Sequence, residues 1–158
     1  MEVRPLCPED SAEVARLWHA GARDSGQADP RFLPRMSPSE YVARIERELE
    51  GGALFGWGIP AAGAHGLVAY LTARIDGASA EWSQDGHLYV CDVDVQADQR
   101  GRGHLRRLLA CAREHAKARG LDRIELSWIA NDPRAEAVWT RLGFRPFVQV
   151  GYLDISER

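Results

Sequence analysis

The chain has 158 residues, of which 45% are hydrophobic and 27% are charged, and its formal net charge is −3. This length and composition are typical of one globular domain with a sizeable core, so residues 1–158 are expected to form a single domain. A protein whose main partner is a polyanion is usually basic overall, and the charge therefore disfavours nucleic acid as a partner.

The cysteines Cys7, Cys91 and Cys111 are odd in number and irregularly spaced. This pattern argues against a disulfide framework and favours a reducing compartment. The histidines are scattered without zinc-site spacing, so no metal is expected. The chain begins without the apolar core of a signal peptide, and it has no run of about 18 apolar residues that could span a membrane. These features predict a cytoplasmic protein with no membrane partner.

The N-terminal region predicts a strand followed by a helix. Residues 2–6 form a short strand pattern, and residues 8–21 have the apolar spacing of a helix that ends at Gly21. Residues 23–34 are rich in Gly, Pro and Asp and predict a loop.

A second helix and a hairpin come next. Ser37 and Glu40 have the spacing of a capping box at the start of the helix, and Gly51 marks its end. Residues 53–59 and 65–75 predict two strands of a hairpin.

The C-terminal half predicts strands and helices in alternation. His87–Val95 is a strong strand pattern, and a helix with an apolar stripe then runs to Gly120. Residues 122–130 predict a strand, residues 131–143 a short helix capped by Asp132, and residues 144–155 a last strand. The whole order predicts a mixed α/β domain.

The segment QRGRGHLRRLL, residues 99–109, connects the strand over His87–Val95 to the long helix. The first N–H groups of a helix lack partners within the helix and carry partial positive charge, which suits a phosphate. Gly101 and Gly103 let the backbone approach a bound group closely. The segment therefore predicts a phosphate or pyrophosphate site, and a polar turn before a buried helix is the alternative.

Two stretches, VDVQADQRGRGHLRRLLACAREHAKARG and NDPRAEAVWTRLGF, resemble the GNAT superfamily of acetyl-CoA-dependent N-acetyltransferases. The family signature [RQ]-x-x-G-x-[GA] is read here from Arg100 to Leu105, with Leu105 where the family has Gly or Ala. The resemblance covers about residues 87–147. It implies a single-domain α/β fold with a mixed sheet of about six strands, mostly antiparallel with a splayed parallel pair, flanked by about four helices.

The resemblance also implies an acyl donor, acetyl-CoA, and no metal. The acceptor would be a primary amine, either on a small molecule or at a peptide N-terminus, attacking directly in a ternary complex. The main-chain amides of one loop would hold the pyrophosphate: Gln99, Arg100, Gly101, Arg102, Gly103, His104 and Leu105. The pantetheine arm would pair with the strand edge at Val93, Val95 and Ala97.

Two residues of the second stretch are also candidates for the coenzyme site. Asn131 matches the family position that contacts pantetheine, with helix capping as an equal alternative. Trp139 stands where many members have tyrosine and would pack beside the coenzyme arm or in the core. An indole N–H donates hydrogen bonds but does not supply protons, so Trp139 is not expected to be a general acid.

Asp92 and Asp94 are the candidates for the general base. They lie two residues apart on one face of the predicted strand, and carboxylates inside an apolar strand are uncommon. Burial beside each other would raise at least one pKa towards the working range. The alternative is that this face is open to solvent and the pair only attracts a cationic amine. Cys91, between Val90 and Asp92, is expected on the opposite face.

The sequence leaves two other functions open. A non-catalytic acyl-CoA-binding or regulatory homologue would account for Leu105 and Trp139 at their two family positions. A nucleic-acid module would use the Arg-Gly segment, but the segment has no interleaved aromatic residues and the chain is acidic. The sequence does not decide between a monomer and a homodimer.

Overall fold

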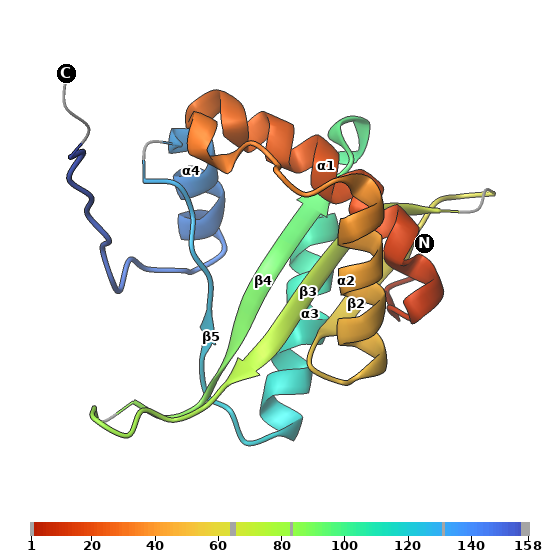
Figure 1. Cartoon of the computed structure of the whole chain (residues 1–158). Helices are drawn as coiled ribbons and strands as arrows, with labels where there is room; N and C mark the ends of the chain where they lie inside the picture. The colour runs from red at the N-terminus through yellow and green to blue at the C-terminus, as the bar shows by residue number, and fades with distance from the viewer. Residues whose placement is uncertain (1, 64–65, 83, 131, 156–158) are drawn as a thin grey trace. The chain divides into compact units, whose positions relative to one another are not determined.

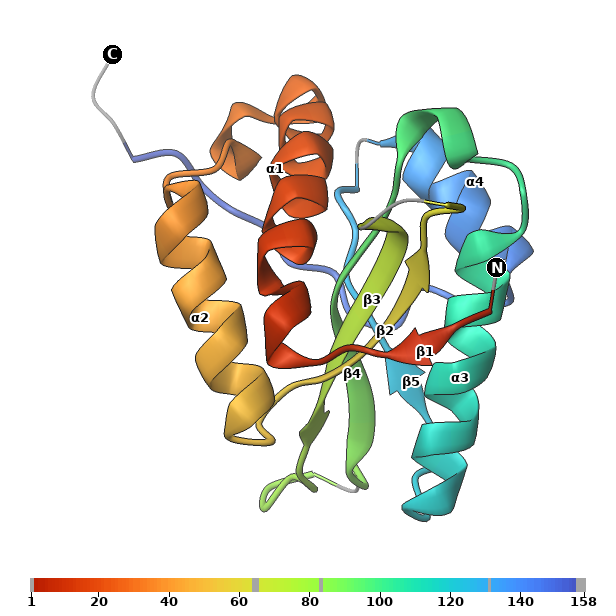
Figure 2. The same ribbon diagram turned by 90° about the vertical axis from the view of Figure 1, so that its right-hand side faces the viewer.

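The structure is a computed structural model, and it divides the chain into two compact units, Met1–Ser127 and Trp128–Arg158. The parts of the chain that it describes are residues 2–63, 66–82, 84–130 and 132–155. In the first unit a five-stranded sheet has the order β1-β2-β3-β4-β5 (Figure 1; β1 is labelled in Figure 2). Neighbouring strands are antiparallel except β4 and β5, which are parallel.

The strands of the sheet are β1 (Arg4–Pro5), β2 (Phe55–Pro60), β3 (Leu67–Asp76), β4 (His87–Val95) and β5 (Ile124–Glu125). The helices of the first unit are α1 (Ser11–Ala28), α2 (Pro38–Glu50) and α3 (His104–Ala118), with short 3-10 turns at Pro8–Asp10, Pro30–Phe32 and Ala97–Gln99. The second unit contains α4 (Pro133–Arg141). The predicted α/β class, with a mixed sheet and a parallel pair, is confirmed.

Helices cover both faces of the sheet in the first unit. Figure 2 shows α1 and α2 on one side of the strands and α3 on the other. On the first side, buried residues of α1 and α2 pack with Leu67 and Tyr70 of β3. On the second side, α3 buries Leu108, Leu109 and Ala112 of its predicted apolar stripe. Burial of these two apolar faces against one sheet provides the main stabilising term of the unit.

The start of α2 forms as the sequence predicts. The Ser37 hydroxyl accepts from the Glu40 N–H at 3.3 Å, and the Glu40 carboxylate accepts from the Ser37 N–H at 2.8 Å. The helix ends with Gly51 as its C-cap. This reciprocal cap fixes the first turn of α2, and with it the direction in which the helix crosses the sheet.

Helix α1 is longer than predicted. It continues through Gly21 to Ala28, so the expected helix end at Gly21 and the loop beginning at residue 23 are wrong. Gly21 serves a long-range contact and not a helix end, because a Cβ at this position would lie only 2.9 Å from the Asp94 Cγ. The glycine therefore lets α1 approach β4 closely instead of ending the helix.

The last two predicted strands are reduced or absent. β5 contains only Ile124–Glu125 of the predicted residues 122–130, and the described residues 144–155 are not assigned to a strand. A strand needs a neighbour that pairs with its backbone groups, and apolar side chains alone do not supply one. Val150 and Ile155 are 93% and 87% exposed, so this segment lacks the burial that would hold it in a sheet.

The close approach at Gly21 predicts that the effect of Gly21→Ala on the free energy of unfolding changes sign when Asp94 is replaced by alanine. Gly21→Ala should lower the free energy of unfolding by about 1–3 kcal/mol, because the added methyl overlaps the Asp94 carboxylate. In an Asp94→Ala background the overlap is removed, and the same change should raise it by about 1 kcal/mol through helix propensity. Urea unfolding of the four proteins measures both values, and equal effects in the two backgrounds would contradict the contact.

Candidate functional site

β4 loses its neighbour on one side after two residues of pairing. Leu88 pairs with Ile124 and Tyr89 with Glu125, and within the described chain β5 pairs with no later residue of β4. Beyond this point β4 is paired only with β3, up to Val95 opposite Ala69. The splayed parallel pair predicted from the family resemblance is therefore present, and it leaves one edge of β4 open.

The main-chain groups of Val93 and Val95 lie along this open edge. The N–H of Gln96 donates to Val68 of β3 at 2.8 Å. Alternate residues of an antiparallel strand face the same neighbour, so the groups of Val93 and Val95 face away from β3. The Val93 N–H donates to the Asp92 Oδ1 at 2.9 Å, and the Val95 N–H donates to the Asp94 Oδ1 at 2.7 Å. The carboxylates of Asp92 and Asp94 thus each accept a hydrogen bond from the N–H of the following residue on this edge.

A β-bulge changes the direction of side chains in the middle of β4. Thr72 is opposite Asp92 and Ala73 is opposite Val90, so Cys91 is the extra residue. As a result Cys91 and Asp92 line one pocket, and the expectation that Cys91 lies on the opposite face is wrong. Strict alternation along the strand could not have revealed this shift.

Burial controls the acidity of both aspartates. It raises the pKa of Asp92 to about 6, although the hydroxyls of Tyr70 and Tyr41 oppose the shift. The Tyr41 hydroxyl donates to the Asp92 Oδ2 at 3.2 Å. Burial also raises the pKa of Asp94, and the Val95 N–H and Arg100 act against it. Asp92 is therefore an anion at neutral pH with a basicity suited to accepting a proton.

The loop before α3 exposes a series of main-chain donors. In the described chain, none of the N–H groups from Gly101 to Arg106 donates a hydrogen bond. Gly101 and Gly103 both have φ of +78°, a conformation that favours glycine. A Cβ at either glycine would meet no atom within 4 Å apart from those of its chain neighbours, so Leu105 does not fill this space. The loop therefore has both the donors and the room that an anion needs.

Gln99 and Arg100, the first two predicted residues of this loop, already use their N–H groups within the preceding turn. The N–H of Gln99 donates to the carbonyl of Gln96 at 2.8 Å, and the N–H of Arg100 donates to the carbonyl of Ala97 at 3.4 Å. Arg102 is exposed. His104 is the first residue of α3 and is only 4% exposed, and burial lowers its pKa, as do the charges of Arg107 and Arg102.

The Arg100 side chain connects three parts of the first unit. Its Nη2 lies 2.9 Å from the Asp24 Oδ2 of α1 and 3.7 Å from the Asp94 Oδ1. Its Nε donates to the carbonyl of Val95 at 3.0 Å. Arg100 thus holds the loop, the end of β4 and α1 together, and its predicted contact with phosphate stays a prediction.

In the second unit, Asp132 caps α4. Its Oδ1 accepts from the N–H groups of Arg134 at 3.0 Å and Ala135 at 3.3 Å, as predicted. Trp139 meets the Phe144 ring edge-on, with centroids 5.5 Å apart. Asn131, the predicted pantetheine contact, lies outside the described residues.

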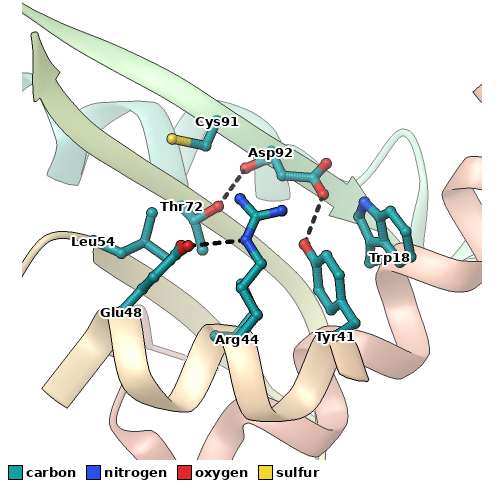
Figure 3. A pocket seen from close by; sticks show the side chains of 9 residues that line it. Trp18, Tyr41, Arg44, Glu48, Leu54, Thr72, Cys91 and Asp92 are labelled. Atoms are coloured by element: carbon teal, nitrogen blue, oxygen red, sulfur yellow. Dashed lines mark hydrogen bonds and ion pairs between the residues drawn. The ribbon is translucent and has the colours of Figure 1, made fainter. Parts of the chain in front are cut away.

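A pocket between α1, α2 and the sheet reaches Asp92 from the helix side (Figure 3). Its volume is about 100 Å³. The lining residues are Trp18, Tyr41, Arg44, Ile45, Glu48, Leu54, Thr72, Cys91 and Asp92. Sequence reasoning identified Asp92 but not the helix residues, because no pattern in α2 indicates which strand its polar positions face.

The comparisons with known proteins agree with this geometry. A model of the "Acetyltransferase (GNAT) family" matches residues 23–144, which is more than half of the chain. The chain belongs to the GNAT acetyltransferase family. The resemblance stated from the sequence is thereby confirmed. A search of curated protein sequences finds no match.

Solved structures share the GNAT fold at low sequence identity. A tetramutant of a Bacillus halodurans protein has a TM-score of 0.86 and 22% identity, covering 98% of this chain and 100% of its own. A GCN5-related N-acetyltransferase from Ralstonia eutropha has a TM-score of 0.76 and 22% identity, covering 98% and 99%. A predicted acetyltransferase from Clostridium acetobutylicum, solved with acetyl-CoA, has a TM-score of 0.75 and 16% identity, covering 98% and 96%.

The described residues contain no group of three or more His, Cys, Asp or Glu side chains that could hold a metal ion. None of their helices combines the length and the apolar character needed to cross a bilayer.

The raised pKa of Asp92 predicts a pH-dependent stability effect. Its folded-state value of about 6 exceeds the usual 3.8, so the folded chain binds more protons between these values and loses stability as pH rises through them. Asp92→Asn should therefore raise the free energy of unfolding at pH 8, by at most about 3 kcal/mol, and the gain should vanish near pH 4. Urea unfolding across this range tests it, with the exposed Asp98→Asn as control. A gain that does not depend on pH would contradict the assignment.

Proposed function

We propose that this chain is an acetyl-CoA-dependent N-acetyltransferase that transfers the acetyl group to a primary amine by direct attack in a ternary complex. The observation that carries the proposal is the series of unpaired N–H donors from Gly101 to Arg106, at the start of α3 and beside the open edge of β4. Membership of the GNAT family and the acetyl-CoA in the Clostridium relative support the choice of donor.

The residues present fit the coenzyme. Consecutive N–H groups at a helix start, with glycine at two positions and open space above both, suit a pyrophosphate. The open edge at Val93 and Val95 would pair with the pantetheine arm, and Ala97, which lies in the 3-10 turn after β4 and not on the strand as predicted, would continue this contact. Asn131 and Trp139 stay candidates for further contacts, and both units would then belong to one acyltransferase domain.

Two N–H groups on the edge of β4 could orient an acyl carbonyl. Those of Val93 and Val95 are held by Asp92 and Asp94 respectively, so an incoming carbonyl would replace one carboxylate oxygen. A preorganised main-chain donor of this kind contributes about 3 kcal/mol of transition-state stabilisation in comparable sites. When bound, acetyl-CoA supplies an activated thioester at this position.

Asp92 is the stronger candidate for the base. It lies both in the helix-side pocket and beside the open edge, and its pKa of about 6 leaves it ionised at neutral pH. It would accept the proton that the amine loses as the new C–N bond forms and the C–S bond breaks. The thiolate that leaves has a reference pKa of about 8.5 and needs little acid assistance, which accommodates Trp139 in place of tyrosine.

A non-catalytic acyl-CoA-binding homologue is the second candidate, because Leu105 and Trp139 replace the family's usual residues. Calorimetry with acetyl-CoA and a thiol-release assay over a panel of amines separate the two. Tight binding without turnover of any amine would favour the non-catalytic function. Turnover of one amine would exclude it.

The donor loop predicts a selective loss of coenzyme affinity. Gly103→Asp would place a carboxylate among the unpaired N–H groups and should weaken acetyl-CoA binding by at least about 100-fold, through repulsion and occupation of the donors. Gly120→Asp is the matched control, because Gly120 also has positive φ (+70°) and open space but lies at the other end of α3. Calorimetry and thermal unfolding of both variants measure affinity and folding. Equal affinities would exclude this loop as the phosphate site.

The carboxylates predict a loss of turnover without a matching loss of coenzyme affinity. Asp92→Asn should lower kcat by about 100-fold or more and remove the rise in rate that accompanies its deprotonation near pH 6. Asp94→Asn provides the comparison on the same strand. Rates from pH 5 to 9 with saturating acetyl-CoA test this, and full activity in both variants would place the base elsewhere.

A further inference from the structure

The helix-side pocket contains a cation whose hydrogen-bonding capacity is only partly used. The Nε of Arg44 donates to the Glu48 Oε1 at 2.9 Å. Its two terminal amino groups donate no hydrogen bond within the described chain. Figure 3 shows the guanidinium pointing into the pocket, on the same side as the Asp92 carboxylate. An Arg guanidinium in this position suits an acceptor group with two oxygens, such as a carboxylate.

Two carboxylates line the pocket beside Arg44: Glu48 on α2, which is paired with Arg44, and Asp92 on β4. Asp92 is fixed by Tyr41 through its Oδ2 and by the Val93 N–H through its Oδ1. Arg44 and Asp92 are not joined in an ion pair within 4.0 Å, although they line one pocket. A ligand between Arg44 and Asp92 would therefore meet the terminal amino groups of Arg44, whose Nε is paired with Glu48, and the carboxylate of Asp92.

The walls of the pocket limit the ligand's size. Trp18 stacks on Tyr41 with ring centroids 4.0 Å apart and an angle of 9° between the planes. Ile45 and Leu54 add apolar surface, and the volume is about 100 Å³. Such a space encloses one small group of the acceptor, and it is open to solvent at Arg44, whose side chain is 46% exposed.

We propose that the acceptor is a small molecule carrying a primary amine and a carboxylate, that is, a free amino acid. Its carboxylate pairs with the terminal amino groups of Arg44, and its amine faces Asp92. The inference rests on the proposed acyl transfer. An aminoglycoside or polyamine has several amines and no carboxylate, so it would leave the terminal amino groups of Arg44 unused. A protein N-terminus has no carboxylate beside its amine and would leave Arg44 unused.

Matched pairs of compounds test the carboxylate. Calorimetric titration uses alanine against ethylamine and leucine against isoamylamine, with the chain saturated with coenzyme A and again with the chain alone. We expect the amino acid of each pair to bind at least about tenfold more tightly. Arg44→Met should abolish this preference. Arg47→Met, an exposed arginine on the same helix outside the pocket, should retain it.

Steady-state kinetics provide a second readout. Arg44→Met should raise KM for an amino acid by about tenfold with little change in kcat, because Arg44 positions the acceptor and does not touch the reacting atoms. Equal binding within each pair, no amino-acid binding in either state, or an unchanged preference in Arg44→Met would overturn the inference. Failure of the proposed acyl transfer is recognised separately, as absence of thiol release from acetyl-CoA with both members of every pair, whether or not the amino acid binds.

Discussion

The divergence of β4 from β5 is the constraint on which the rest of the site depends. Main-chain groups without a strand partner are costly to bury, so the chain must supply partners for Val93 and Val95. It does so with its own side chains, because Asp92 and Asp94 accept from the two N–H groups and Arg100 donates to the Val95 carbonyl. The same arrangement keeps the edge accessible to another acceptor.

Helix α1 contributes to this edge from a distant part of the sequence. Gly21 allows α1 to lie against Asp94, and Asp24, one turn further along, pairs with Arg100. This arrangement requires α1 to continue beyond Gly21, where the local sequence pattern predicts its end. The length of α1 is therefore linked to the geometry of β4 and of the loop before α3.

Local patterns were sufficient to predict much of the fold. The capping box of α2, the bounds of β4 and the cap of α4 each depend on residues within a few positions of one another. The open edge followed from the family resemblance, and the free loop N–H groups followed from the helix start expected after Gly103. Contacts within such short stretches are similar in most tertiary settings, which is why the sequence predicts them.

Features that depend on distant residues were not predictable. Arg44 and Asp92 line one pocket only because α2 crosses β4, and the bulge at Cys91 depends on its register with β3. The strand expected over residues 144–155 had suitable apolar side chains, but a strand also requires a pairing partner. Sequence periodicity records which side chains prefer burial and carries no information about which backbone will be adjacent.

The carboxylate that caps the Val95 N–H has a thermodynamic consequence. Covalently attached beside the donor, it is an intramolecular competitor that any amide or thioester oxygen must displace. When the Asp94 carboxylate is displaced from the Val95 N–H, it stays in a partly buried site of low polarity, where the charged form is costly. It also loses the Val95 hydrogen bond, which is one of the contacts that offset this cost. Binding at the β4 edge and protonation of Asp94 are therefore coupled. A ligand oxygen that takes the Val95 N–H raises the proton affinity of the Asp94 carboxylate.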